Sequence, residues 1–380
     1  MSTPTPFDPP ADETHWLDIA EELSDRFAER APEIDRDGAL PTQNLKEIHE
    51  SGLDTILLPK EHGGAGVSNR TFGRAVGTIA RGCPSTATIW LMHVGAATTL
   101  VALGNPDTVE TYAQAWRNGA RFANALSEPT SGNQFLMPLQ EGTPTEGGWL
   151  LSGAKRFVSG CETADHFLVN ALIGGEPTFF AVDRDEGMSF VDIWDSMGLR
   201  GTRSQLISFD GVLLREERRG RPLGLNDPNP IGYGLPWLSI GVAEAVFAAL
   251  LNHARTRTIP SIGGPLANMQ WIQFEVADAR VALEAARLLA GKTLWLADQG
   301  SPETLTSSIE AKLAANEMAR QVAGLALRAG GGSAYLKTHP IERHFRDAHS
   351  GGLMAYSAEV CRDFIGKQVL GVGAEASAFG

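Results

Sequence analysis

The chain contains a run of three glycines, in RAGGGSA, of the kind that can cradle the phosphates of a bound nucleotide. Dinucleotide-binding loops place such glycines between a preceding strand and a following helix. Here the glycines instead follow a segment with helical periodicity, from about Ser307 to Arg328. A second segment, GGAGVS at Gly63 to Ser68, lacks the lysine of a phosphate-binding loop. We therefore expect no Rossmann domain, and we interpret GGAGVS as a turn lining the site.

Three histidines, His339, His344 and His349, are spaced five residues apart and could be metal ligands. Five residues turn an α-helix by about 500°, so the three side chains would be scattered over its surface. No cysteine or carboxylate cluster beside them completes the donor set that a metal ion needs. We expect no metal site and interpret the histidines as part of a solvated helix end.

Composition limits the class of protein. The 380 residues exceed the usual single-domain size, and 43% hydrophobic with 20% charged residues is typical of a globular protein. We see no apolar run approaching the roughly 20 residues of a membrane span, so no membrane partner is expected. The net charge of −13 argues against binding nucleic acid. Three scattered cysteines, Cys83, Cys161 and Cys361, are expected to be reduced thiols.

The first residues are polar and rich in proline. Residues 1–13, MSTPTPFDPPADE, have neither the basic start nor the apolar stretch of a secretion signal. We expect them to form a disordered tail, and we expect the protein to be cytoplasmic.

The elements divide the remaining chain into three parts. Residues 14–120 have helical periodicity; in NLKEIHESG, Leu45 and Ile48 share one face and Gly52 provides the stop. Residues 121–232 contain short β-rich runs separated by glycine and acidic turns, which predicts a β-barrel or sandwich. Residues 233–380 are helical again. We predict a mainly α protein with a central β domain.

The last part shows the clearest periodicity. Apolar residues recur at spacings of four and three in QWIQFEVADARVALEAARLLA, at Ile272, Val276, Ala279, Leu283 and Ala286. Further helices are predicted around Gly241, from about Ser307 to Arg328, and from about Ser357 to Val369. Together they favour an antiparallel four-helix bundle.

Several short motifs in a fixed order resemble those of the acyl-CoA dehydrogenase family. They are LPKEHGGAGVS (58–68), CPSTATIWLMH (83–93), ALSEPTSG (125–132), GAKRFVSGCETAD (153–165) and MGLRGTRS (197–204), followed by the bundle segments and RAGGGSAYLKTHPIERHFRDA. The resemblance covers about Leu45 to Leu370. It implies an oxidoreductase with FAD as cofactor and a homodimer or homotetramer as the assembly.

The resemblance assigns a flavin site. It places the backbone of Leu126 and the hydroxyl of Ser127 at the pyrimidine edge of the ring and includes Asn133 among the cofactor contacts. Phe157 takes the place of the family's ring-covering tryptophan, and Ser159 points toward flavin N5. A flat ring with apolar faces and a polar edge needs such a combination of an aromatic wall and hydrogen bonds.

The contacts expected for the FAD diphosphate depart from the family pattern. The Arg-x-x-Phe-Gly motif is replaced by RTRTIPSIGG at 255–264, which leaves Arg257 as the substitute. Arg328 stands where the family has a glutamine. By resemblance, Gly331 and Gly332 lie against the adenine end of FAD in a neighbouring subunit, which implies an oligomer.

The family's catalytic glutamate is missing. The glutamate takes the α proton of an acyl thioester while hydride leaves for the flavin, and its position corresponds to Ala355. The alternative position used by some members falls near Ile231, which is also not acidic. Three other carboxylates, Asp347, Glu359 and Glu244, are weaker candidates with structural interpretations as ion-paired or helix-surface residues.

Three functions remain open. An acyl-CoA dehydrogenase would oxidise an acyl-CoA and pass electrons to an electron-transferring flavoprotein. A flavin-dependent monooxygenase of the same fold would act on a small organic substrate with O2 and flavin reduced by a separate flavin reductase, and it needs no α-proton base. The Ser-Gly pair in FVSGCETAD resembles such hydroxylases. A catalytically silent subunit is the third. We favour them in this order.

Overall fold

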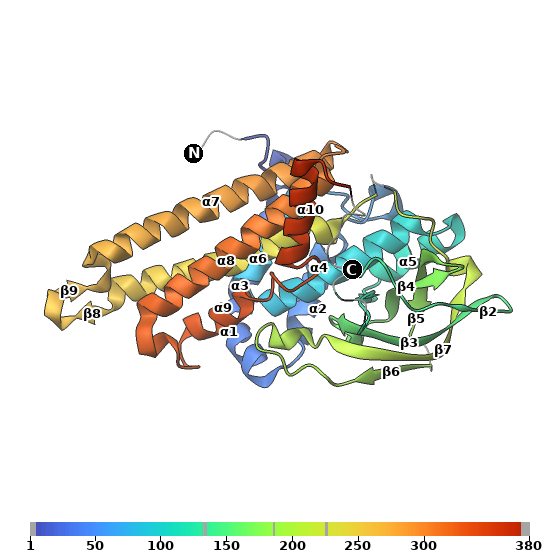
Figure 1. Cartoon of the computed structure of the whole chain (residues 1–380), viewed down its shortest axis with the longest axis horizontal. Coiled ribbons are helices and arrows are strands. Elements are labelled where there is room, and N and C mark those ends of the chain that lie inside the picture. The colour runs from blue at the N-terminus through green and yellow to red at the C-terminus, as the bar shows by residue number, and fades with distance from the viewer. Residues whose placement is uncertain (1–4, 131, 133–134, 185–186, 225–226, 374–380) are drawn as a thin grey trace.

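The computed structural model describes residues 5–130, 132, 135–184, 187–224 and 227–373. Helices come first, strands occupy the middle of the chain, and helices return at the end (Figure 1). The predicted fold class, mainly α with a central β domain, is confirmed.

The first part of the chain is helical. Its elements are α1 (Thr14–Asp37), α2 (Thr42–Glu50), α3 (Asn69–Gly82), α4 (Pro84–Leu103) and α5 (Pro106–Arg117). As predicted, Leu45 and Ile48 are buried on α2, and Gly52 ends that segment with a φ of 83°. Part of the expected tail also has defined contacts, because Phe7 lies edge-on to Trp295 with ring centroids 6.1 Å apart.

The β domain consists of two sheets facing one core. The first sheet has the order β1 (Phe122–Ala125), β4 (His166–Ile173), β5 (Glu176–Asp183), and β1 runs parallel to β4. The second has the order β2 (Thr143–Thr145), β3 (Gly148–Val158), β7 (Gln205–Arg215), β6 (Met188–Val191) and is antiparallel. Alternate residues such as Leu151, Phe167, Phe180 and Leu214 point inward and are fully buried. The predicted sandwich is therefore present.

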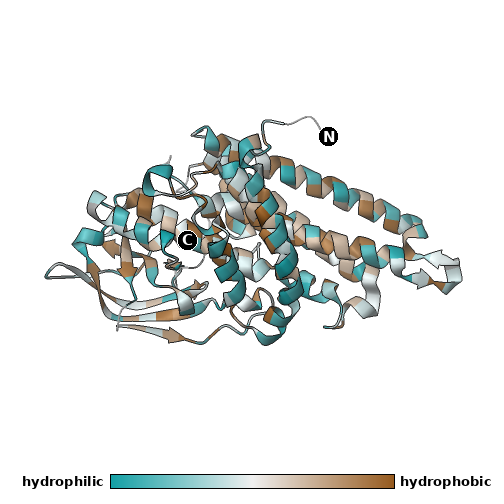
Figure 2. Cartoon of the chain, turned by 180° about the vertical axis from the view of Figure 1, so that it is seen from behind, coloured by the Kyte–Doolittle hydropathy of each residue, from teal (hydrophilic) through white to brown (hydrophobic). Residues whose placement is uncertain are grey.

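Long helices form the C-terminal part and lie side by side in Figure 1. They are α6 (Pro230–Thr256), α7 (Gln270–Asp298) and α8 (Thr304–Ala334), with the shorter α9 (Pro340–Ala348) and α10 (Ala358–Leu370) packed on α8. A small hairpin, β8 (Thr258–Ile259) and β9 (Gly264–Pro265), joins α6 to α7. Hydrophobic and hydrophilic positions alternate along the long helices in Figure 2, as expected for helices with one buried face.

The glycine run bends the end of α8. Gly331 has a φ of 57° and a ψ of −149°, which interrupts the helix there. The glycines therefore follow a helix rather than a strand, as predicted, and the geometry of a dinucleotide-binding loop is absent at this position.

Two core helices are more apolar than we expected. By length and composition alone, α4 and α6 could each cross a membrane. In the fold, 72% of each hydrophobic window is buried against other elements. Glycines let α6 approach α3 closely, because a Cβ on Gly241 would lie only 2.1 Å from the carbonyl oxygen of Gly77. These apolar stretches therefore form the centre of the core.

Candidate functional site

A cavity of about 560 Å³ lies between the β domain and the helices that flank it. It brings together four of the predicted flavin contacts, Leu126, Ser127, Phe157 and Ser159. Residues from α4, from the β3–β7 side of the second sheet, and from the segment between α9 and α10 complete its wall. These four residues, predicted from two separate motifs, therefore lie around one cavity.

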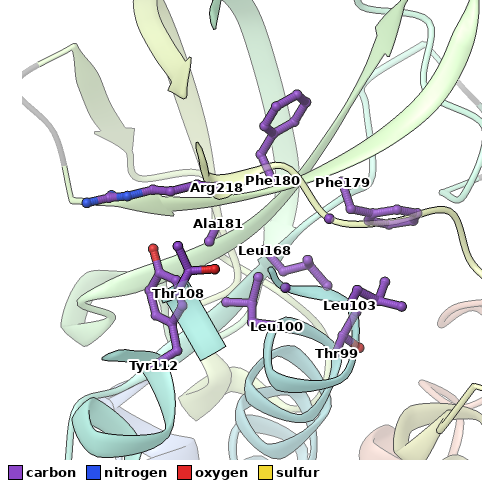
Figure 3. Close-up of a pocket in the computed structure, with 12 residues that line it drawn as sticks. Thr99, Leu100, Leu103, Thr108, Tyr112, Leu168, Phe179, Phe180, Ala181 and Arg218 are labelled. Carbon is purple, nitrogen blue, oxygen red and sulfur yellow. The ribbon is translucent and has the colours of Figure 1, made fainter. Parts of the chain in front are cut away.

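A second cavity is far smaller. It has a volume of about 10 Å³, room for a single water molecule, and lies between α4, α5 and the first sheet. Figure 3 shows Leu100, Leu103, Leu168 and Phe179 around it, with Arg218 at its edge. The Arg218 guanidinium is already engaged by Asp183, at 2.6 Å. This cavity is too small for an organic ligand.

A buried ion pair holds the SEPTSG loop against β3. The Lys155 ammonium donates to Glu128 at 2.8 Å and to Asn170 at 2.9 Å, and both charged side chains are fully buried. Burial lowers the pKa of Lys155, while the Glu128 carboxylate opposes that shift. Glu128 also accepts the backbone N–H of Leu139 at 2.8 Å. The pair thus fixes the backbone that presents Leu126 and Ser127 to the cavity.

Strand β3 is irregular where it meets the cavity. Its pairing with β7 shifts register between Lys155 and Val158, and Phe157 has a φ of 60°. Because of this irregularity, Arg156 and Phe157 both line the cavity instead of pointing to opposite faces of the sheet. Phe157 is 52% exposed and meets Trp194 edge-on. It offers an aromatic wall to a ligand.

A chain of hydroxyl groups ends at Ser159. Thr202 donates to the carbonyl oxygen of Leu199 at 2.9 Å, Ser204 lies 2.8 Å from Thr202, and Ser159 lies 2.8 Å from Ser204. Each hydroxyl has one hydrogen to donate. Since a carbonyl can only accept, the chain runs from Ser159 to Ser204 to Thr202. Ser159 therefore presents lone pairs to the cavity.

Backbone strain is concentrated around the same cavity. Within the described chain, positive φ occurs at four residues other than glycine: Phe157, Leu199, Arg203 and Ala355. Three of them, all except Arg203, line the cavity. Such backbone conformations cost energy and are typical of functional sites.

Both positions expected for the catalytic glutamate lie in the cavity wall. Ala355 and Ile231 are lining residues, as the resemblance implies, and both are apolar. No aspartate or glutamate lines the cavity in the part of the chain that the structure describes. Among the described residues, nothing acidic replaces the base at either position.

The other carboxylate candidates do not reach the cavity. Asp347 is buried and accepts the backbone N–H of Leu199 at 2.8 Å, and its burial raises its pKa to about 6. Glu244 is bound by Arg287, and Glu359 is 70% exposed on α10. Glu244 and Glu359 form ion pairs with arginines, which agrees with their structural interpretation. Asp347 was interpreted as ion-paired, but within the described chain it forms no salt bridge and is held by the Leu199 N–H instead.

Some cavity residues were missed or misread in the sequence. Arg156, Trp194 and His349 line the cavity, whereas sequence reasoning placed His349 at a solvated helix end. That interpretation is wrong for His349 and also for His344, which is buried. GGAGVS forms a turn before α3 but is not among the lining residues. The irregularity of β3 and the path of the segment after α9 decide these positions, and neither has a sequence signal.

The residues predicted for the FAD diphosphate and adenine do not line the cavity. Arg257 follows α6 and is exposed; Arg328 is exposed on α8, where it pairs with Glu275. Gly331 and Gly332 lie at the exposed bend of α8. Asn133 lies outside the described residues. Across the described ranges, no three metal-binding side chains cluster.

The lining of the cavity fits an isoalloxazine ring. Phe157, Met92 and Ile231 supply apolar surface, and Ser127 and Ser159 supply polar groups. A flat ring with apolar faces and a polar edge matches this arrangement.

Comparisons with known proteins agree with the geometry. The acyl-CoA dehydrogenase N-terminal, middle and C-terminal domain models match residues 12–120, 123–212 and 234–370. Acryloyl-CoA reductase (NADH) of Anaerotignum propionicum is 29% identical over 94% of this chain and 95% of its own length.

Two solved structures share the fold. Butyryl-CoA dehydrogenase from Megasphaera elsdenii superposes with a TM-score of 0.88 at 22% identity, covering 97% of this chain and 100% of the other. KijD3, in complex with FMN and dTDP-3-amino-2,3,6-trideoxy-4-keto-3-methyl-D-glucose, superposes with a TM-score of 0.85 at 25% identity, covering 99% and 98%. The chain is therefore a flavin-using oxidoreductase that belongs to the acyl-CoA dehydrogenase family.

Proposed function

We propose that the protein is a flavin-dependent monooxygenase that acts on a small organic substrate with O2 and reduced flavin. One observation carries the proposal: Ala355 and Ile231, the two positions where family members hold the α-proton base, both line the cavity and are both apolar. Dehydrogenation of an acyl thioester needs a general base at the α carbon, and the family supplies it as a carboxylate from these positions. Oxygen activation by a reduced flavin does not.

The cavity residues have separate roles toward the flavin. When bound, the flavin supplies two-electron and oxygen chemistry that side chains cannot. Leu126 and Ser127 would hold its polar edge, and Phe157 would supply an aromatic wall for one face of the ring. Ser159 accepts a hydrogen bond, which suits the N5–H of reduced flavin better than the unprotonated N5 of oxidised flavin. The hydroxyl chain through Ser204 thus favours the form that reacts with O2.

His349 is the residue that handles the substrate proton. Its Nδ1 lies 2.7 Å from the carbonyl oxygen of Phe345, and a carbonyl can only accept, so Nδ1 carries the hydrogen. The neutral ring therefore has its basic lone pair on Nε2. His349 lines the cavity, and no carboxylate lines it among the described residues, so the imidazole would be the group that accepts a proton from the substrate.

The residues expected at the FAD diphosphate and adenine bear on the form of the flavin. FAD is our proposal, with Arg257, Arg328 and the Gly331 bend contributed by a neighbouring copy of the chain in a homodimer or homotetramer. These residues do not line the cavity of their own chain. FMN is the form present in the KijD3 structure, and chromatography of the flavin released on denaturation distinguishes the two. Electrons would come from a separate flavin reductase.

Two spectroscopic measurements test the reaction. The flavin-loaded protein is first mixed anaerobically with a panel of acyl-CoA thioesters, and the absorbance near ~450 nm, which reports the oxidised flavin, should stay constant. The flavin is then reduced chemically and aerated. We expect its absorbance to return with a lag compared with free reduced flavin, because the site holds the reduced form during oxygen activation. Bleaching by an acyl-CoA would contradict the proposal.

An acyl-CoA dehydrogenase is the second candidate. It is favoured by the curated relative acryloyl-CoA reductase, which matches nearly the whole chain. In that case an acyl-CoA would be the substrate, an electron-transferring flavoprotein would be the partner, and a group other than the usual glutamate would take the α proton. Bleaching by one member of the thioester panel, with no lag on aeration, would select this function.

A further inference from the structure

The cavity contains one cationic side chain for which the described part of the chain provides no acceptor. Arg156 lines the cavity, forms no salt bridge or side-chain hydrogen bond there, and has a buried Nε without a partner. Its guanidinium carbon lies 4.7 Å from the centre of the Phe157 ring. This contact satisfies none of the five N–H donors by a hydrogen bond.

The other ionisable groups of the cavity are accounted for. The Arg346 guanidinium binds Asp35 at 2.6 Å and 2.8 Å, Glu342, and the carbonyl oxygen of Met197. His349 is held through Nδ1 by Phe345. Arg156 therefore leaves an uncompensated positive charge in the wall, although the whole chain carries a net charge of −13.

The backbone holds Arg156 in this position. Its N–H donates to the carbonyl oxygen of Ser127 at 2.8 Å, and the irregularity after Lys155 places it beside Phe157 on the cavity side. A partly buried guanidinium without a partner is costly, and an anionic ligand removes that cost. Phosphate and carboxylate groups match the planar guanidinium in a bidentate arrangement.

We propose that Arg156 is an anion-binding residue of the cavity, taking a phosphate or carboxylate group of the molecule bound there. That group belongs either to the flavin, as its phosphate, or to the substrate, as an anionic substituent. The inference rests on the cavity being the flavin site of the proposed function. It does not depend on whether the reaction is an oxygenation or a dehydrogenation.

The test compares the wild type with Arg156→Gln, Arg156→Lys and the control Arg74→Gln. Arg74 also lies over an aromatic ring, that of Trp237 at 5.2 Å, but does not line the cavity. The control removes the same charge from an equivalent setting. Circular dichroism checks that each variant is folded. If Arg156→Gln does not fold, the comparison is made with Arg156→Lys, which keeps the positive charge but loses the planar guanidinium.

The first arm measures binding of FMN and riboflavin, which differ by the phosphate. If the flavin phosphate is the anion, the wild type and Arg74→Gln prefer FMN, and Arg156→Gln loses about ten- to hundredfold of that preference. The second arm titrates the flavin-loaded proteins with inorganic phosphate, benzoate and neutral benzamide while recording the flavin spectrum. If the substrate carries the anion, benzoate or phosphate binding weakens by a similar factor in Arg156→Gln, and benzamide binding does not change.

Arg156→Lys should show an intermediate loss in whichever arm responds, because an ammonium cannot bind in a bidentate way. The proposal is overturned if Arg156→Gln matches the wild type both in its FMN preference and toward benzoate and phosphate. Failure of every variant and of the wild type to take up any flavin would instead overturn the proposed function.

Discussion

At the scale of single residues, the direction of the hydrogen bonds at Ser159 decides whether its hydroxyl offers the flavin a donor or an acceptor. Thr202 donates to a backbone carbonyl, and this fixes the donors of the whole chain up to Ser159. Both Thr202 and Ser204 are buried. The protein therefore offers an acceptor at the place where the family resemblance puts flavin N5.

We expect Ser204→Ala to lower the reduction potential of the bound flavin. Without Ser204, Ser159 can turn its hydrogen toward oxidised N5, so the preference for reduced flavin is lost. One net hydrogen bond corresponds to about 10–30 mV for a two-electron couple. The measurement is a spectroelectrochemical titration. Ser350→Ala is the control, because Ser350 also lines the cavity but donates to the carbonyl of Asp347; a rise in potential for Ser204→Ala would contradict the proposed hydrogen-bond direction.

At the scale of elements, α8 supports the turn that carries Ala355. Lys312 and Asn316 of α8 both donate to the carbonyl oxygen of Gly351, at 2.9 Å and 3.0 Å. Gly351 must be glycine, because a Cβ there would lie 2.5 Å from the Asn316 side chain and 2.6 Å from that of Ser239. The cavity wall is thus set by contacts with a helix behind it.

Lys312 makes the stability of this arrangement depend on pH. Its burial lowers its pKa from 10.5 to about 8. Below pH 8 Lys312 is charged in both the folded and the unfolded state, so its burial lowers the free energy of unfolding. This penalty disappears as the pH rises from about 8 toward 10.5, where the folded protein carries the neutral amine. A difference of this size corresponds to about 3 kcal/mol.

We expect the free energy of unfolding of the wild type, relative to Lys312→Met, to rise by about 2–3 kcal/mol between pH 7 and pH 10. Urea unfolding at the two pH values measures this difference. Lys46→Met serves as a control, since the Lys46 side chain is 65% exposed and should show no such change. A constant difference between wild type and Lys312→Met would mean that Lys312 is not desolvated as its burial indicates.

At the scale of the whole molecule, one face of α7 lacks a partner within the described chain. Phe274, Val281 and Leu288 are spaced seven residues apart and are 61%, 69% and 56% exposed. Residues with this spacing share one face of a helix. The assembly expected from the family resemblance would cover such a face.

We expect glutamate at all three positions to yield monomers and to reduce flavin retention, because Arg257, Arg328 and the Gly331 bend would then no longer reach a neighbouring cavity. Light scattering after gel filtration, with the flavin-to-protein absorbance ratio, measures both effects. The control carries Gln273→Glu and Arg280→Glu on other faces of α7. An unchanged mass for the triple variant would exclude this face as the interface.

The sequence by itself determined the order of helices, strands and helices, because hydrophobic periodicity is local: Ile272, Ala279 and Leu283 are buried on α7 as their spacing predicts. Its motifs also placed Leu126, Ser127, Phe157, Ser159 and Ala355 around one site. Periodicity and short motifs are both carried by residues close together in the sequence, so they can be recognised without the tertiary structure.

The tertiary structure alone decided which side chains enter the cavity. Arg156 lines it because β3 loses its alternation before Val158, and His349 lines it because the segment after α9 folds back toward the β domain. The burial of Lys312 and the direction of the hydroxyl chain depend in the same way on partners distant in sequence. Charge, burial and donor direction are properties of packed neighbours, so they become readable only when those neighbours are in place.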